Sequence, residues 1–195
     1  MAGEGGRHRH LALRSCRGDE PVTAPSGPGL DQRPRPRRRS ASSTGTGARV
    51  IAYVDSSVVA RAYLADEPGH DDAVTLLEQS DLGLVTGTWT RIEVSSALVR
   101  ATRSGRGDEV GLLALLDADL GVGGPVAVVS APTAEVEAEA MHLVRTHGLR
   151  AMDAWHLATA QLTLPGLLEP GEEAGFASRD QAQSEVAALL GLRVI

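Results

Sequence analysis

The stretch YVDSSVVARAYLADE (53–67) indicates the fold and raises the first question about function. It overlaps the end of a short apolar run, VIAYV (50–54), passes through an acid and two serines, and continues with helical periodicity. A strand that leads directly into a helix is typical of sheets with parallel strands. The question is why a carboxylate, that of Asp55, stands at the junction.

Further short apolar runs predict four more strands, with segments of helical period between them. The strands are expected at 82–87, 126–130, 175–178 and 192–195, and helices at 90–103 and 108–120. A helix that ends before Gly148, in MHLVRTHG, is also expected. Since parallel strands need long crossover connections, this order predicts an open α/β sandwich with a five-stranded parallel sheet and helices on both faces.

Four acids stand at predicted strand ends or helix starts, where ligands bind in open parallel sheets. Asp55 follows the first strand, and Glu93 lies in the predicted first turn of the helix in TWTRIEVSSAL. Asp153 opens the helix in GLRAMDAWHLATA, and Asp180 follows the fourth strand in GFASRDQAQSEVAALLG. Because the carboxyl ends of parallel strands meet at one edge, these acids are expected to form a cluster of negative charge.

Each acid also has a plainer interpretation as a helix cap. Asp is a favoured N-cap, worth about 0.5–2 kcal/mol over Ala, and Thr90 with Glu93 spells a T-x-x-E capping box. The two roles are compatible in one residue. Capping alone does not account for acids at all four places, since Ser, Thr or Asn would cap without mutual repulsion. Mg²⁺ or Mn²⁺ would offset that repulsion, and no Cys or His cluster has zinc spacing.

Four segments, by their order and spacing, carry a resemblance to a known family: YVDSSVVARAYL, TRIEVSSAL, LRAMDAWHLATA and FASRDQAQSEVAALLGLRV. In these segments the sequence resembles a PIN-domain ribonuclease, specifically a VapC-type toxin of a bacterial toxin–antitoxin pair. The likeness covers about residues 50–195. DAWHLATA is close to the family's usual Asp-x-x-His-Leu-Ala-x-Ala. The resemblance implies a PIN-like three-layer α/β/α sandwich with a central five-stranded parallel sheet.

The resemblance also implies an activity, the metal-dependent cleavage of RNA, with products that carry a 5′-phosphate and a 3′-hydroxyl. It implies that an acidic quartet holds one or two Mg²⁺ or Mn²⁺ ions, and that a homodimer and a cognate antitoxin exist. By motif, the quartet corresponds to Asp55, Glu93, Asp153 and Asp180. Ser56 matches a supporting polar position after the first acid, and Ser178 stands where the family usually has Thr, which keeps the hydroxyl.

Other residues near the motif acids are candidates for substrate contact. Arg61, Arg91 and Arg150 are candidates for binding phosphate, and a salt bridge to a neighbour is the plainer alternative for each. His156, three residues after Asp153 on the same helical face, is expected to pack and hydrogen-bond within the fold rather than contact substrate.

Two amphipathic segments, 69–80 and 105–120, are candidates for contact with a second subunit or an antitoxin. The alternative is that they are ordinary helices that face the core. Trp89 and Trp155 are expected in core or dimer packing rather than in stacking on bases.

Two other functional classes compete for the same residues. A PIN-like fold kept as a non-catalytic interaction module would usually lose acids, whereas all four motif positions are acids here. A phosphotransfer or dehalogenase-like enzyme needs a second Asp two residues after the first and a Lys in its pocket. Ser57 stands at that position and the chain has no Lys, so this class is set aside.

Charge divides the chain into two unlike parts. Residues 1–49 carry ten arginines against four acids, and residues 50–195 carry nine against 21. The first part is rich in Pro, Gly and Arg and lacks strand or helical period, which predicts a disordered basic tail. Its run 33–39 is a candidate for phosphate contact, and a start codon placed too early is a further interpretation. Residues 50–195 are expected to form the PIN domain.

The one cysteine, Cys16, allows no intramolecular disulfide, and the sequence has neither a signal-peptide core nor a run of about 18 apolar residues. A soluble, cytoplasmic protein without a membrane partner is therefore expected.

Overall fold

Five parallel strands form one sheet in the order β3-β2-β1-β4-β5. The computed structural model describes residues 48–79 and 81–195, so the expected tail at 1–49 lies outside the described residues, apart from its last two. The strands are β1 (Val50–Val54), β2 (Leu82–Gly87), β3 (Val126–Val129), β4 (Glu173–Ala177) and β5 (Arg193–Val194). Every expected strand is present, although β4 begins two residues earlier than predicted and β5 is shorter.

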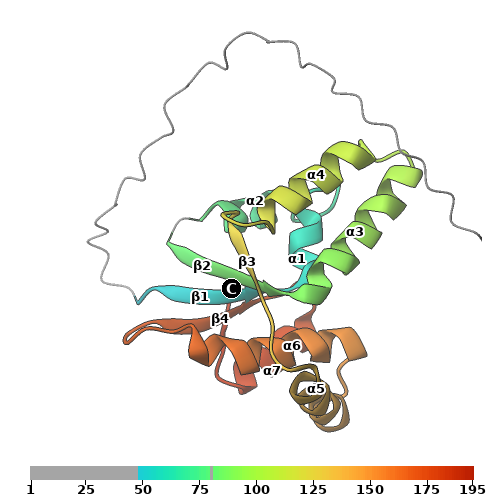
Figure 1. Cartoon of the computed structure of the whole chain (residues 1–195). Coiled ribbons are helices and arrows are strands. Elements are labelled where there is room, and N and C mark those ends of the chain that lie inside the picture. Colours follow the sequence, from blue (N-terminus) through green and yellow to red (C-terminus); the bar gives the residue numbers. More distant parts are fainter. Residues whose placement is uncertain (1–47, 80) are drawn as a thin grey trace, which may run out of the picture. The chain divides into compact units, whose positions relative to one another are not determined.

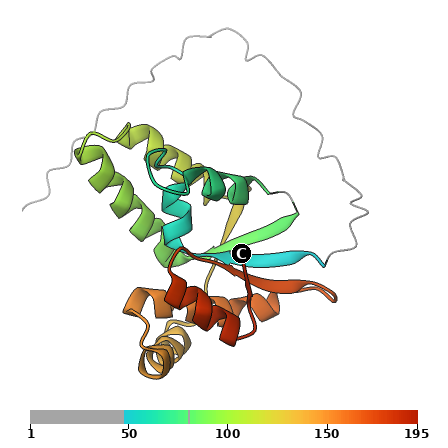
Figure 2. The ribbon, with the colours of Figure 1, turned by 180° about the vertical axis from the view of Figure 1, so that it is seen from behind.

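Helices cover both faces of the sheet. They are α1 (Ser56–Arg61), α2 (His70–Glu78), α3 (Thr88–Arg103), α4 (Glu109–Asp119), α5 (Thr133–His147), α6 (Ala151–Thr163) and α7 (Gln181–Leu189), with a 3-10 helix, η1 (Leu164–Gly166). Figures 1 and 2 show α1 to α4 on one side of the sheet and α5 to α7 on the other. The three-layer α/β/α sandwich is thereby confirmed, and within the described residues no helix has the length and apolarity to span a bilayer.

The central strand, β1, separates two hydrophobic cores because its side chains alternate between the faces. Its first, third and fifth residues pack with α1 to α4, while Ile51 and Tyr53 pack with α5, α6 and α7. All five residues of β1 are buried, as expected for a strand covered on both faces. Asp55 is the next residue, so the strand delivers it to the edge of the sheet between the two cores.

The strand order reverses between β1 and β4. From β1 the chain moves outward to β2 and β3, and then α5 and α6 carry it across to β4 on the other side of β1. In open α/β sheets, ligands bind outside the carboxyl ends of the strands at such a switch point. The Asp55 N–H donates to the carbonyl of Ala177 at 2.9 Å across this junction, so the segments after β1 and β4 begin side by side.

Candidate active site at the carboxyl edge of the sheet

The four motif acids come from four different elements and lie at the same edge of the sheet. Asp55 follows β1, Glu93 lies in α3, Asp153 in α6, and Asp180 follows β4. His156 lies between Glu93 and Asp55, and the charges of Asp180 and Asp55 act on Asp153. The structure therefore places all four acids in one neighbourhood.

Asp55 is buried, with 4% of its surface exposed. Its Oδ2 accepts a hydrogen bond from the Ser57 N–H at 2.9 Å and thereby caps α1. Its Oδ1 lies 3.5 Å from Nε2 of Gln183, which donates to it, and 3.8 Å from Nε2 of His156. The capping role expected for Asp55 is confirmed, and its second oxygen faces side chains of α6 and α7.

Glu93 is partly buried and accepts a hydrogen bond from Nε2 of His156 at 2.5 Å. Burial by itself would raise the pKa of Glu93, but the hydrogen bond and charge of His156, and the hydroxyl of Ser56, lower it. Burial would lower the pKa of His156, whereas Glu93 and the charges of Asp55 and Asp153 raise it. Glu93 and His156 therefore favour each other's charged forms, and the Ser56 hydroxyl also favours the charged form of Glu93.

Asp153 lies in the first turn of α6 and experiences excess negative charge. Burial, and then the charges of Asp180 and Asp55, raise its pKa, and the positive charges of Arg150 and His156 offset this only in part. Like charges raise one another's pKa in this way when no cation compensates them. Further positive charge at the carboxyl edge of the sheet would therefore stabilise the ionised form of Asp153.

Gln183 is fully buried in α7 and joins the segments that carry the acids. Its Nε2 donates to the main-chain carbonyl of Asp153 at 2.9 Å, and its Oε1 accepts from Oγ of Ser178 at 2.5 Å. Its own N–H donates to Oδ1 of Asp180 at 3.0 Å, so Asp180 caps α7 as expected. Gln183 was not predicted from the sequence. Its place on the buried face of α7, three residues before Val186, was the available signal.

Ser178 contacts the main chain of Asp180 and the side chain of Gln183. Its Oγ accepts the N–H of Asp180 at 3.0 Å and donates to Gln183. The hydroxyl thus fixes the turn that leads from β4 to the last acid, which is a role that Thr would also fill.

Two of the alternative interpretations as helix caps are wrong. Strand β2 leads into α3 without a loop, and the helix begins at 88 with Gly87 as its N-cap. Thr90 therefore lies inside the helix with its hydroxyl buried against Oγ1 of Thr86 at 2.6 Å, and it forms no capping box with Glu93. Similarly, α6 begins two residues before Asp153, whose side chain caps nothing.

A hard divalent cation suits the four acids in chemistry, because carboxylate oxygens are its preferred ligands. Within 48–79 and 81–195, however, no three His, Cys, Asp or Glu side chains are gathered closely enough to hold a metal ion. Asp55 and Asp180 each cap a helix with one carboxylate oxygen, and Glu93 accepts the hydrogen bond of His156.

The three arginines predicted to contact phosphate differ in their surroundings. Arg61 donates from Nη1 to the carbonyl of Pro68 at 3.0 Å. Arg91 lies 3.7 Å from Asp117, which matches the salt-bridge alternative. Arg150 is exposed immediately before α6, and its positive charge lowers the pKa of Asp153.

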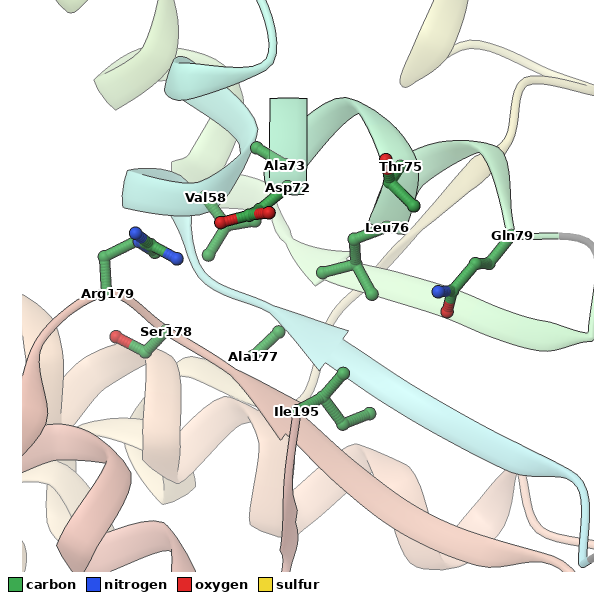
Figure 3. Close-up of a pocket in the computed structure, with 10 residues that line it drawn as sticks. All are labelled: Val58, Asp72, Ala73, Thr75, Leu76, Gln79, Ala177, Ser178, Arg179 and Ile195. Atoms are coloured by element: carbon green, nitrogen blue, oxygen red, sulfur yellow. The ribbon is translucent and has the colours of Figure 1, made fainter. Parts of the chain in front are cut away.

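A cavity of about 300 Å³ lies beside the end of β4 and is lined by α1, α2 and the segment after β4 (Figure 3). Val58 and Leu76 supply part of its apolar lining, and Ser178 and Arg179 line the side next to the last acid. The guanidinium of Arg179 lies so close to Gly69 that a Cβ there would come within 2.5 Å of Nη2. Arg179 is exposed and was not predicted from the sequence as a candidate.

Comparison with known proteins gives one family match. A family model described as a PIN domain matches residues 52–168, which include Asp55, Glu93 and Asp153, whereas Asp180 lies beyond the match. No curated protein matches the sequence. Similar solved structures include PAE2754 from Pyrobaculum aerophilum (19% identity, 72% of this chain and 82% of that chain, TM-score 0.45). FitAcB from Neisseria gonorrhoeae is also similar, at 18% identity over 74% of this chain and 96% of that chain, with a TM-score of 0.46. So is VapBC-1 from nontypeable Haemophilus influenzae, at 12% identity over 74% of this chain and 96% of that chain, with a TM-score of 0.46.

Proposed function

Since this chain belongs to the PIN-domain family, we propose that it is a metal-dependent endoribonuclease. The observation that carries the proposal is the convergence of four acids, three of them within the family match, at the switch point of the sheet. The raised pKa of Asp153, caused by burial and by the charges of Asp180 and Asp55, supports it. An electrostatic excess of this kind beside a crevice is typical of functional sites.

In this proposal one or two Mg²⁺ or Mn²⁺ ions are held by Asp55, Glu93, Asp153 and Asp180. A bound ion of this kind activates water, polarises the phosphate and neutralises the leaving oxygen. The protein contributes orientation. The Ser57 N–H fixes one oxygen of Asp55, and the amide of Gln183 ties the main chain of Asp153 to α7.

RNA is the proposed substrate, although residues 50–195 carry 21 acids against nine arginines. A polyanion that approaches such a domain needs local cations beside the cleavage site. Arg150 and Arg179 adjoin the last two acids and are the cations we propose for this role. Arg61 and Arg91 stay predicted contacts, each with a partner inside the protein that competes with phosphate.

We further propose that the nuclease is the toxin of a type II toxin–antitoxin pair and works as a homodimer. The likeness of its four motifs to VapC-type toxins supports the pair with a cognate antitoxin. Exposed apolar side chains support self-association, since α4 exposes Val110 (77%) and Leu115 (55%) and α3 exposes Ile92 (59%). Light scattering on the purified protein should report a dimer, and Leu115→Glu should shift it toward the monomer if α4 forms the contact.

Cleavage of total RNA by the purified full chain tests the nuclease. Fragments are expected with Mg²⁺ or Mn²⁺ and should vanish with EDTA or in Asp55→Asn. A matched control is Asp108→Asn, because Asp108 also caps a helix, accepting the Gly111 N–H at 2.9 Å, but does so at α4. RNA that stays intact with every metal, from protein that binds Mn²⁺ and is free of antitoxin, would count against the proposal for the RNAs tested.

The alternative of a non-catalytic PIN-fold module is favoured by one observation. Within the described part of the chain, no three His, Cys, Asp or Glu side chains are assembled to hold a metal ion. Metal binding separates the two functions, because a non-catalytic module has no need for it. Calorimetric titration with Mn²⁺ that shows no binding to the folded protein would favour the module.

A further inference from the structure

The imidazole of His156 is held at both of its nitrogens by side chains from the other elements of the site. Its Nδ1 is 2.8 Å from the hydroxyl of Tyr53 on β1, and its Nε2 is 2.5 Å from Oε2 of Glu93 on α3. The same Nε2 is 3.8 Å from Oδ1 of Asp55. Only 1% of the surface of His156 is exposed, so water does not compete for these contacts.

Tyr53, the partner at Nδ1, is itself fixed. It is fully buried and its ring stacks on Phe176 of β4, with ring centroids 5.6 Å apart and planes 6° apart. A Cβ on Gly87 would lie 2.5 Å from the Tyr53 hydroxyl, so a glycine at the start of α3 is what lets the hydroxyl sit there. The position of the imidazole is therefore set by β1 and β4, which hold Tyr53, and not by α6 alone.

The proton at Nε2 follows from hydrogen-bond chemistry. An ionised carboxylate can only accept, so the bond to Glu93 requires a proton on Nε2. The Tyr53 hydroxyl can donate to or accept from Nδ1, so this arrangement holds for the neutral and for the charged imidazole. In both states His156 is a donor to Glu93 and has no lone pair at Nε2 with which to bind a metal.

From these contacts we infer that His156 is a positioning residue, which orients the Glu93 carboxylate toward Asp55 for binding of the divalent cation. The inference rests on the proposed function, because it takes Glu93 as a ligand. The chain of contacts runs from Tyr53 through the imidazole to Glu93, and so fixes a carboxylate on α3 relative to the one that follows β1. Residues that orient a metal ligand in this way typically contribute about 10–100-fold to metal affinity.

Mn²⁺ binding to the full chain, measured by calorimetry with antitoxin absent, tests the inference through three variants. His156→Gln keeps an N–H donor at the distance of Nε2, His156→Asn keeps a polar partner for Tyr53 but does not reach Glu93, and His156→Phe removes both contacts. We expect about 10–100-fold weaker binding for Asn and Phe, and binding within a few-fold of wild type for Gln. His70→Gln is the control, since His70 bonds the carbonyl of Arg61 on α1 and should leave Mn²⁺ affinity unchanged.

Each result decides between interpretations. Rescue by Gln, with Asn and Phe weakened and all variants folded by circular dichroism, supports positioning. If Gln and Asn weaken binding equally, or if both bind as tightly as wild type, the inference is overturned and His156 only fills space in the core. If His156→Phe fails to fold, the comparison of His156→Asn with His156→Gln still tests the inference. A wild-type protein that binds no Mn²⁺ would refute the proposed metal site itself, and the inference with it.

Discussion

The amide of Gln183 donates to the main-chain carbonyl of Asp153 at 2.9 Å, so a buried side chain of α7 holds the first turn of α6. The same side chain accepts from Ser178 and lies 3.5 Å from Oδ1 of Asp55. One residue thereby links three segments that carry the acids.

Replacing Gln183 with Leu should lower both stability and activity. Leu has a similar volume but leaves the Ser178 hydroxyl and the Asp153 carbonyl without their buried partner, which costs about 1–3 kcal/mol. Urea unfolding should show the loss of stability, and RNA cleavage should fall because the three segments lose their common tie. Gln183→Glu should be worse at neutral pH, since its carboxylate cannot donate to Asp153 and lies near Asp55. A Leu variant as stable and active as wild type would show that the amide contacts matter little.

Asp55→Asn should fold normally and lose activity. Asn is as good an N-cap as Asp, so α1 keeps the bond from the Ser57 N–H. The change removes the charge proposed to bind the metal, and we expect RNA cleavage to fall by at least about 100-fold, since even groups that only orient ligands contribute up to that much. Thermal unfolding checks that the Asp55→Asn variant folds normally, and RNA cleavage measured on the same preparation checks that it has lost activity. Full activity in Asp55→Asn would exclude Asp55 as a ligand.

Asp153→Asn should stabilise the metal-free protein at neutral pH. The folded-state pKa of Asp153 is raised, mainly by burial and then by Asp180 and Asp55, so the folded protein favours its protonated form. Its contribution to stability is therefore greatest below the unfolded pKa and is lost as pH rises through the folded pKa. At pH 7 the wild type bears the full cost, which Asn avoids.

Thermal unfolding in EDTA at pH 7 and in acid checks the prediction for Asp153. The advantage of Asn should shrink as the pH falls toward the range where the wild-type carboxyl is protonated. Asp81→Asn, an exposed change remote from the acids in sequence, serves as the control. An Asn variant less stable than wild type at pH 7 would contradict the idea of uncompensated charge.

Arg179→Ala should weaken binding of RNA without changing the fold. Its guanidinium lies at the cavity beside the last acid, where a phosphate would be adjacent to the proposed cleavage site (Figure 3). Fluorescence anisotropy with an RNA in the Asp55→Asn background avoids cleavage during the measurement. We expect several-fold weaker binding and a shallower salt dependence, because one phosphate contact is lost. Arg145→Ala, an exposed arginine on α5, should have little effect.

Local sequence patterns predicted most of the fold because the sheet is buried on both faces. Its strands therefore appear as short apolar runs, and the acids that follow them are found by position alone. The ends of elements were less predictable. Thr90 with Glu93 has the letters of a capping box, but β2 leads directly into α3 with Gly87 as the N-cap, so the helix begins earlier and the threonine is a core residue.

The contacts among site residues were not predictable, because they join elements far apart in the sequence. Nothing in DAWHLATA says that His156 meets Tyr53 and Glu93, which are 103 and 63 residues away. The expectation that His156 hydrogen-bonds within the fold is confirmed, but its partner at Nε2 is one of the motif acids. Arg179 was missed for a similar reason, since its neighbour Gly69 belongs to the other end of the domain.

The position of β1 in the middle of the sheet affects how the protein is made. Synthesis proceeds from the N-terminus, and β1 and its first acid are made early, yet one of its two neighbouring strands, β4, begins only at Glu173. While the ribosome is still extending the chain, one side of β1 stays unpaired and Asp180 does not yet exist. In the proposed nuclease, the site therefore lacks its fourth acid until synthesis has passed residue 180, so a growing chain that stops before Asp180 should not cleave RNA.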